Sequence, residues 1–158
     1  DRSDNCEINL MDFDKNALLY CQEKILEIKV KKKKKEKINF LHKSINELIR
    51  DKDNTFLKKQ DLIYSAGLLD YLTNEAAKHL IHVLYESLKT NGTLIVGNFD
   101  PQNETRNYME YVMEWYLLYR NELDMLGLTS GLPVLRECFV QQDLSRINNF
   151  LVVKKTRG

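Results

Sequence analysis

Short runs of apolar residues alternate along this chain with longer segments in which apolar residues recur every three or four positions. The short runs have the length of buried β-strands and lie at residues 7–12, 38–41, 62–64 and 93–96. The segments at residues 15–28 and 74–89 have helical spacing. This alternation predicts an α/β fold, with a mainly parallel sheet that carries helices on both of its faces.

The last third of the chain follows a different pattern. Asp100 and Pro101 interrupt the alternation, because the residue before a proline avoids helical conformation. We expect a long aromatic helix over residues 104–120, and then two strands, at residues 134–140 and 150–153, that form a C-terminal antiparallel pair. At 158 residues the length predicts one domain, residues 1–158.

Composition and charge narrow the class of protein. The net charge of +1 argues against a dedicated nucleic-acid binder, which would be strongly basic. We expect the lysine-rich residues 29–37 to form a solvated loop, with a phosphate or nucleic-acid contact as the alternative. No apolar run is long enough to span a membrane. Three widely spaced cysteines and three histidines form no metal-ligand pattern, so we expect no metal and free thiols in a reducing cytoplasm.

Three loops follow the carboxyl ends of predicted strands, where α/β sheets bind ligands. In the first, Asp12 can accept the two hydroxyls of a ribose and Phe13 can cover a purine ring, although Asp12 and Asp14 are also suited to capping a helix. The second contains Ser44 and Ile45. The small residues of the third allow a ligand to approach the backbone closely, or simply make a tight turn, and they are Ser65, Ala66 and Gly67.

Three segments, in order, resemble class I S-adenosylmethionine-dependent methyltransferases, which have a Rossmann-like fold. Met-Asp-Phe-Asp at residues 11–14 is similar to the end of the second strand of that family. Asp-Leu-Ile-Tyr-Ser-Ala-Gly-Leu-Leu-Asp-Tyr-Leu at residues 61–72 is similar to its fourth strand and the loop that follows. Residues 84–96 are similar to the next helix, turn and strand, although Asn91-Gly92 stands where the family has two glycines.

The resemblance implies S-adenosylmethionine as cofactor and gives each loop a role. It places Asp12 on the cofactor ribose and Phe13 beside the adenine. Ser44 stands where many members have an aspartate for the adenine amine, with Ile45 next to it. The loop of Ser65, Ala66 and Gly67 would run under the methionine part.

The Gly-rich loop that follows the first strand in that family has no counterpart in these residues, which contain no Gly-x-Gly. We therefore expect a fragment of a longer protein that lacks the first strand of the family fold. An N-terminal segment or another chain would then complete the sheet.

The implied reaction is attack of an unknown nitrogen, oxygen, sulfur or carbon acceptor on the sulfonium methyl group, which needs positioning more than acid–base catalysis. The residues we expect near the acceptor are Tyr71, Asn98, Tyr108, Trp115, Tyr119 and Arg120. The alternative is a non-catalytic interaction module that uses the aromatic helix 104–120 as a partner surface.

Overall fold

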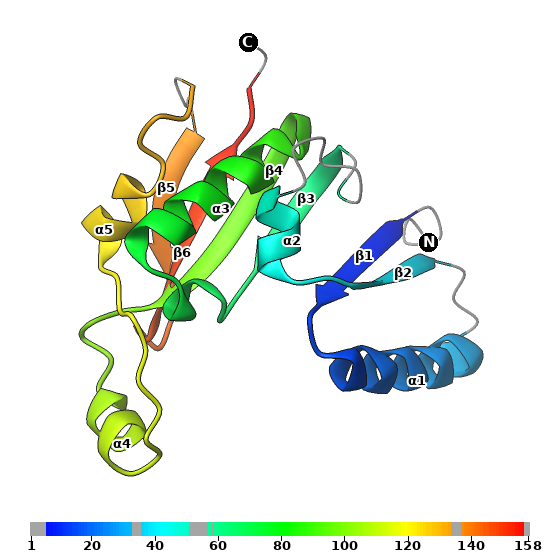
Figure 1. The fold of residues 1–158 in the computed structure, drawn as a ribbon, viewed down its shortest axis with the longest axis horizontal. Helices are drawn as coiled ribbons and strands as arrows, with labels where there is room; N and C mark the ends of the chain where they lie inside the picture. The colour runs from blue at the N-terminus through cyan, green and yellow to red at the C-terminus, as the bar shows by residue number, and fades with distance from the viewer. Residues whose placement is uncertain (1–5, 33–35, 51–56, 58, 134–136, 157–158) are drawn as a thin grey trace. The chain divides into compact units, whose positions relative to one another are not determined.

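The computed structural model describes residues 6–32, 36–50, 57, 59–133 and 137–156, and they form two compact units that meet in sequence between residues 51 and 52. The first unit contains the first two strands and the second contains the other four (Figure 1). We describe each unit by itself. The single domain expected from the sequence stays a prediction.

In the first unit, two strands and two helices alternate. Strands β1 (Glu7–Asp12) and β2 (Lys37–His42) pair in parallel, with Asp12 opposite His42 at their carboxyl ends. Helix α1 (Lys15–Lys32) connects them, and α2 (Ile45–Arg50) follows β2. The apolar runs at residues 7–12 and 38–41 predicted both strands, and the structure confirms them.

Helix α1 begins where the sequence predicts and ends later. The Asn16 N–H donates to Asp14 Oδ1 at 2.8 Å, which is the helix cap expected of Asp14. The helix continues to Lys32, through residues expected to be loop, because lysine is a good helix former. Residues 33–35 of the lysine-rich run, and the loop predicted at residues 51–54, lie outside the described residues.

In the second unit a four-stranded sheet has the order β3-β4-β6-β5. Strands β3 (Gln60–Ser65) and β4 (Leu88–Phe99) pair in parallel, as predicted. Strands β5 (Glu137–Gln142) and β6 (Asn148–Lys154) form the predicted antiparallel pair, and β6 also pairs antiparallel with β4. Residues 134–136 of the predicted strand lie outside the described residues. The fold is thus mixed α/β with parallel pairing and an antiparallel strand pair, but the described strands form two sheets where one was expected.

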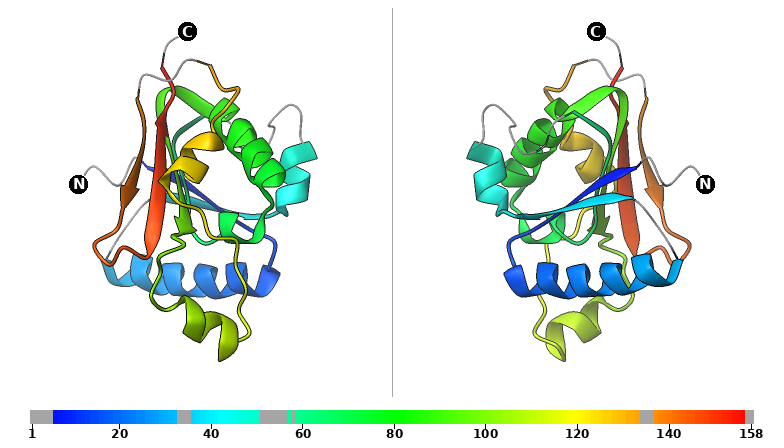
Figure 2. Two further views of the ribbon diagram at one scale, coloured as in Figure 1. Left: turned by 90° about the vertical axis from the view of Figure 1, so that its left-hand side faces the viewer. Right: turned by 90° about the vertical axis from the view of Figure 1, so that its right-hand side faces the viewer.

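Helices α3 and α5 of the second unit pack on one face of its sheet, whereas α4 lies beyond the end of the strands (Figure 2). Helix α3 (Asn74–Glu86) is capped by Thr73, whose hydroxyl accepts the Ala76 N–H, and it buries the apolar stripe predicted for it. Helix α5 (Glu122–Gly127) packs against β5 and β6 on the same face and begins with a capping box between Asn121 and Asp124. The described residues include no helix long and apolar enough to cross a membrane.

The prediction of a long aromatic helix over residues 104–120 is wrong. Helix α4 (Arg106–Tyr111) ends after six residues, and the chain runs on without regular structure until α5. Glu114 has a φ of 51°, a left-handed conformation that a continuous α-helix excludes. Tyr108, Trp115 and Tyr119 therefore do not lie on one helix. The helix ends early because the buried side chain of Arg120 hydrogen-bonds to groups at the end of the sheet and holds the chain there.

Candidate functional site

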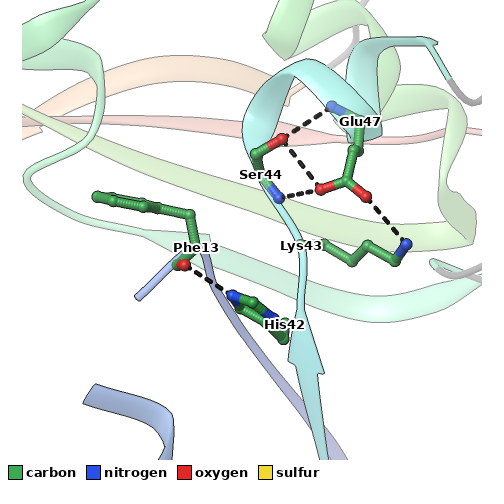
Figure 3. A network of polar contacts seen from close by, with 5 residues as sticks. All are labelled: Phe13, His42, Lys43, Ser44 and Glu47. Carbon is green, nitrogen blue, oxygen red and sulfur yellow. Dashed lines mark hydrogen bonds and ion pairs between the residues drawn. The ribbon is translucent and has the colours of Figure 1, made fainter. Parts of the chain in front are cut away.

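The carboxyl end of β1 presents a carboxylate beside an exposed aromatic ring. One oxygen of Asp12, Oδ1, accepts the Asp14 N–H at 2.9 Å, and within the described residues the other oxygen has no partner. The ring of Phe13 is 76% exposed and points away from His42, whose Nε2 donates to the Phe13 carbonyl at 2.9 Å (Figure 3). The loop backbone is thus fixed by β2 while Asp12 Oδ2 and the Phe13 ring stay available to a ligand.

The loop after β2 is a helix cap. Ser44 Oγ accepts the Glu47 N–H at 3.2 Å, while Glu47 Oε2 accepts from the Ser44 N–H at 2.8 Å and from its hydroxyl at 3.1 Å (Figure 3). The Ser44 N–H and then the Lys43 side chain lower the pKa of Glu47 to about 2. The hydroxyl of Ser44 therefore both donates and accepts within this cap, and half-buried Ile45 is the first residue of the helix behind it.

The loop after β3 leaves open space, as its small residues suggest. Ser65 ends the strand opposite Val96, and Ala66 and Gly67 are exposed. Gly67 has a φ of 71°, and no described atom lies within 4 Å of the place where a Cβ would stand. A ligand can therefore approach this backbone closely.

Two of the residues expected to bind the acceptor are buried instead at the carboxyl end of β4. Arg120 is 2% exposed and donates to the carbonyl oxygens of Leu69 and Leu72, to Asn98 Oδ1 at 2.6 Å and to Asn74 Oδ1. Asn98, 1% exposed, donates in turn to the carbonyl oxygens of Phe99 and Leu118. These contacts fasten residues 118–120 to the sheet and to the start of α3.

An acidic residue that sequence reasoning missed lies beside this cluster. Asp70 is 2% exposed; its Oδ1 accepts the Phe99 N–H at 2.7 Å, and its Oδ2 has no hydrogen-bond partner among the described residues. Burial raises the pKa of Asp70, and the nearby Arg120 charge opposes that rise. A carboxylate inside the apolar run of residues 68–72 was the signal in the sequence that could have identified it.

Aromatic side chains meet at the same edge of the second unit. Trp115 Nε1 donates to the Tyr71 hydroxyl at 2.8 Å, and the Trp115 ring meets Phe99 edge-on with centroids 6.2 Å apart. Tyr71 and Trp115 are 58% and 38% exposed. The structure thus brings together two residues expected to contact the acceptor, although they are 44 positions apart.

A pocket of about 550 Å³ opens beside them, between the start of α3 and the segment that follows α4. It is lined by Thr73, Asn74, Glu75, Pro101, Arg106, Leu117, Leu118, Tyr119 and Arg120. The Arg106 guanidinium lies 4.5 Å from the centre of the Tyr119 ring, and burial, followed by the Glu110 charge, raises the pKa of Tyr119. Tyr108, also expected here, is 60% exposed on α4 and does not line the pocket. Sequence reasoning missed Arg106.

The predicted cofactor residues therefore fall into two groups. Asp12, Phe13, Ser44 and Ile45 belong to the first unit, and Ser65, Ala66 and Gly67 belong to the second. Within each unit they follow the carboxyl ends of parallel strands. Among the described residues no three His, Cys, Asp or Glu side chains gather to hold a metal ion.

Comparison with solved structures shows which fold this is. The chain matches a possible exported protein from Bordetella parapertussis with a TM-score of 0.70 and 13% identity, over 96% of this chain and 54% of that one. It matches magnesium protoporphyrin IX methyltransferase from Synechocystis PCC 6803, solved with bound SAH, with a TM-score of 0.65 and 13% identity, over 96% of this chain and 73% of that one. It matches the apo S-adenosylmethionine-dependent methyltransferase SibL with a TM-score of 0.68 and 12% identity, over 96% of this chain and 44% of that one.

These similarities establish the fold of class I S-adenosylmethionine-dependent methyltransferases. The chain spans about half the length of the first of these proteins. No family model matches the chain. No curated protein matches it either.

Proposed function

We propose that this chain is the adenosine-binding and acceptor-binding part of an S-adenosylmethionine-dependent methyltransferase, acting within a longer protein. Fold alone does not determine function, so the proposal depends on the site. The observation that carries it is the end of β1, where Asp12 offers a carboxylate oxygen without a partner among the described residues, next to the exposed ring of Phe13.

Within each unit, the residues present suit a part of the cofactor that the fold implies. Asp12 Oδ2 would accept hydrogen bonds from the ribose hydroxyls, and Phe13 would cover one face of the adenine. The open space at Gly67 would admit the chain of the methionine part close to the backbone. Ser44 is less well suited to the adenine amine, because its hydroxyl is held by Glu47.

The cofactor would supply a methyl group on a positively charged sulfur, and the protein would supply position. Transfer then requires the acceptor atom to be held in line with the methyl group, so no charged pair of catalytic residues is needed. Arg120 and Asn98 would contribute by fixing the segment of residues 117–120 that lines the pocket, since their polar groups bind the protein itself.

A second candidate is an interaction module without catalysis. The observation that favours it is the exposed aromatic surface on and after α4, where Tyr108, Tyr111 and Tyr116 are 60%, 80% and 67% exposed. A partner surface of this kind needs no cofactor. Binding of adenosine compounds therefore separates the two candidates.

The test is an NMR titration of the 158-residue chain with S-adenosylhomocysteine, comparing Asp12→Asn with the matched control Asp14→Asn. Asparagine at position 12 keeps an oxygen for the Asp14 N–H and removes the charge from the ribose contact. We expect Asp12→Asn to weaken binding about tenfold or more, and Asp14→Asn to leave it nearly unchanged.

Because these residues contain no Gly-x-Gly loop, we expect the wild-type dissociation constant to lie well above the micromolar range. Micromolar affinity would overturn that expectation. Equal affinities of wild type and Asp12→Asn would overturn the assignment of Asp12, and a chain that gives no titration shifts would favour the interaction module.

A further inference from the structure

Tyr71 and Trp115 lie near the carboxyl ends of β3 and β4 in the second unit, where a ligand is expected. Tyr71 ends the short 3-10 helix η2 (Leu69–Tyr71), six residues beyond the end of β3, and Phe99 ends β4. Because β3 and β4 are parallel, their carboxyl ends share one edge of the sheet. Ligands of α/β sheets bind at this edge.

The hydrogen bond between the two side chains orients the Tyr71 hydroxyl. A phenol oxygen has one hydrogen, which prefers the plane of the ring and so has two favoured directions. The Trp115 N–H can only donate, and at 2.8 Å it occupies one of these directions. The Tyr71 hydrogen therefore points the other way, and no acceptor among the described residues receives it.

Trp115 is itself held in place by a ring contact and by backbone hydrogen bonds. Phe99, which ends β4, meets the indole ring edge-on with an interplanar angle of 79°. The backbone N–H of Trp115 donates to the Met109 carbonyl at 2.9 Å. Three residues later, the backbone N–H of Leu118 donates to the Asp70 carbonyl at 2.8 Å. The indole is thus anchored on both sides in the sequence while 38% of its surface remains exposed.

We propose that the Tyr71 hydroxyl recognises the methyl acceptor by donating a hydrogen bond to it, and that Trp115 is a positioning residue that aims this hydroxyl. This inference rests on the proposed function and adds the class of acceptor. Exposed faces of two aromatic rings favour a flat apolar group. A directed donor with no partner among the described residues favours a lone pair on that group, and we infer an oxygen, as in a carbonyl, an ether or a phenolic oxygen.

Two probes of equal shape test the inference on the 158-residue chain. Acetophenone carries a carbonyl oxygen on a benzene ring, and ethylbenzene replaces that oxygen with hydrogens. Ligand-detected NMR measures the affinity for each. We expect Tyr71→Phe to weaken acetophenone binding about fivefold and to leave ethylbenzene binding unchanged, because it removes one hydrogen bond and no ring.

Trp115→Phe tests the positioning role, since it keeps an aromatic ring and removes the N–H that orients Tyr71. We expect acetophenone affinity to fall in this variant too, with Tyr71 still present, and the double variant to lose no more than Tyr71→Phe alone. The control is Tyr111→Phe, which removes a hydroxyl from a tyrosine that is 80% exposed on α4 and should change neither affinity. Circular dichroism checks that each variant is folded.

Tyr71 is not the recognition contact if wild type binds neither probe, or if Tyr71→Phe changes both affinities equally or neither. Trp115 is not a positioning residue if its replacement leaves acetophenone affinity unchanged. These results are separate from the proposed function. Probe recognition without S-adenosylhomocysteine binding would overturn the methyltransferase proposal and leave Tyr71 as a recognition contact for a ligand that is not a methyl acceptor. The reverse result would overturn this inference alone.

Discussion

The end of β1 and the end of β4 look alike in sequence and differ in what their polar groups do. Both place a polar residue at the carboxyl end of a strand, Asp12 in one and Asn98 in the other. Asp12 uses one oxygen for its own turn and keeps the other, whereas Asn98 and Arg120 are buried and bind the protein. A polar residue at a strand end is thus a candidate ligand contact only where its hydrogen-bonding groups remain available after folding.

The largest expected effect on stability comes from replacing Arg120, which belongs to the buried cluster at the end of β4. Arg120→Met removes the side-chain donor to the carbonyl oxygens of Leu69 and Leu72, of which Leu69 keeps the Leu72 N–H, and it removes the positive charge near Asp70. We therefore expect a loss of about 3–5 kcal/mol in the free energy of unfolding. Urea unfolding followed by the fluorescence of Trp115, the one tryptophan of the chain, measures it. Arg106→Met, at a more exposed arginine, is the control and should cost about 1 kcal/mol or less.

Asn98→Leu should have the next largest effect. Leucine has the same branched shape but cannot accept from Arg120 or donate to the Leu118 carbonyl, so two buried groups lose these partners. We expect a cost of about 2–3 kcal/mol in the same unfolding experiment. A cost below about 1 kcal/mol would mean that the cluster is not what fastens residues 118–120.

Ser44→Ala tests the cap in the first unit. Loss of the hydroxyl that accepts the Glu47 N–H should destabilise α2 by about 1 kcal/mol, seen as faster hydrogen exchange of the α2 amides. Lys43→Ala breaks the exposed ion pair with Glu47 and keeps the Ser44 hydroxyl, so it should have an effect of about 0.5 kcal/mol or less. If exchange is unchanged in Ser44→Ala, the Ser44 hydroxyl does not stabilise α2 and remains available to a ligand.

The same cap should make α2 sensitive to acid in a defined range. The pKa of Glu47 falls from 4.5 to about 2 on folding, so its contribution to stability is complete above pH 4.5 and disappears as the pH falls through 2. Exchange of the α2 amides, corrected for the intrinsic effect of pH, should rise across this range in wild type. Glu47→Gln should flatten the rise, and an equal rise in both proteins would contradict the assignment.

The smallest effect on stability is expected at Asp12, at the end of β1. Asp12→Asn keeps the oxygen that accepts the Asp14 N–H, so we expect the free energy of unfolding to change by less than about 0.5 kcal/mol. The same variant is expected to lose ligand affinity. A large loss of stability would place Asp12 with Arg120, among the residues that hold the fold.

Local patterns predicted the strands of this protein well and its long-range polar contacts poorly. The apolar runs at residues 93–96 and 150–153 identify β4 and β6, because burial of a strand leaves a continuous apolar signature. The run at residues 62–64 identifies β3, although Leu62 and Tyr64 are exposed. Residues 104–120 also have helical spacing, yet the helix ends at Tyr111. Spacing does not report that Arg120 will bind groups 22 to 51 positions away, and those contacts determine the path of the chain.

The candidate site divides in the same way. The open space at Gly67 could be predicted, because a small residue at a strand end leaves room beside the backbone. The binding roles of Asp12, Phe13 and Gly67 stay predictions. The burial of Asn98, the engagement of Ser44 with Glu47 and the missed residue Asp70 could not be predicted, since each depends on which partners the folded chain brings within hydrogen-bond distance.

The position of β6 has a consequence for how this protein is made. Among the strands that the structure describes, β6 is the last to be synthesised, yet it lies between β4 and β5 and contributes Leu151 and Val153 to the core, both fully buried. While the ribosome is still adding these residues, β5 has no neighbour and β4 pairs only with β3. The sheet of the second unit must therefore close after translation of residue 154, through contacts distant in sequence, which makes its folding slow and exposes β4 to wrong partners until then.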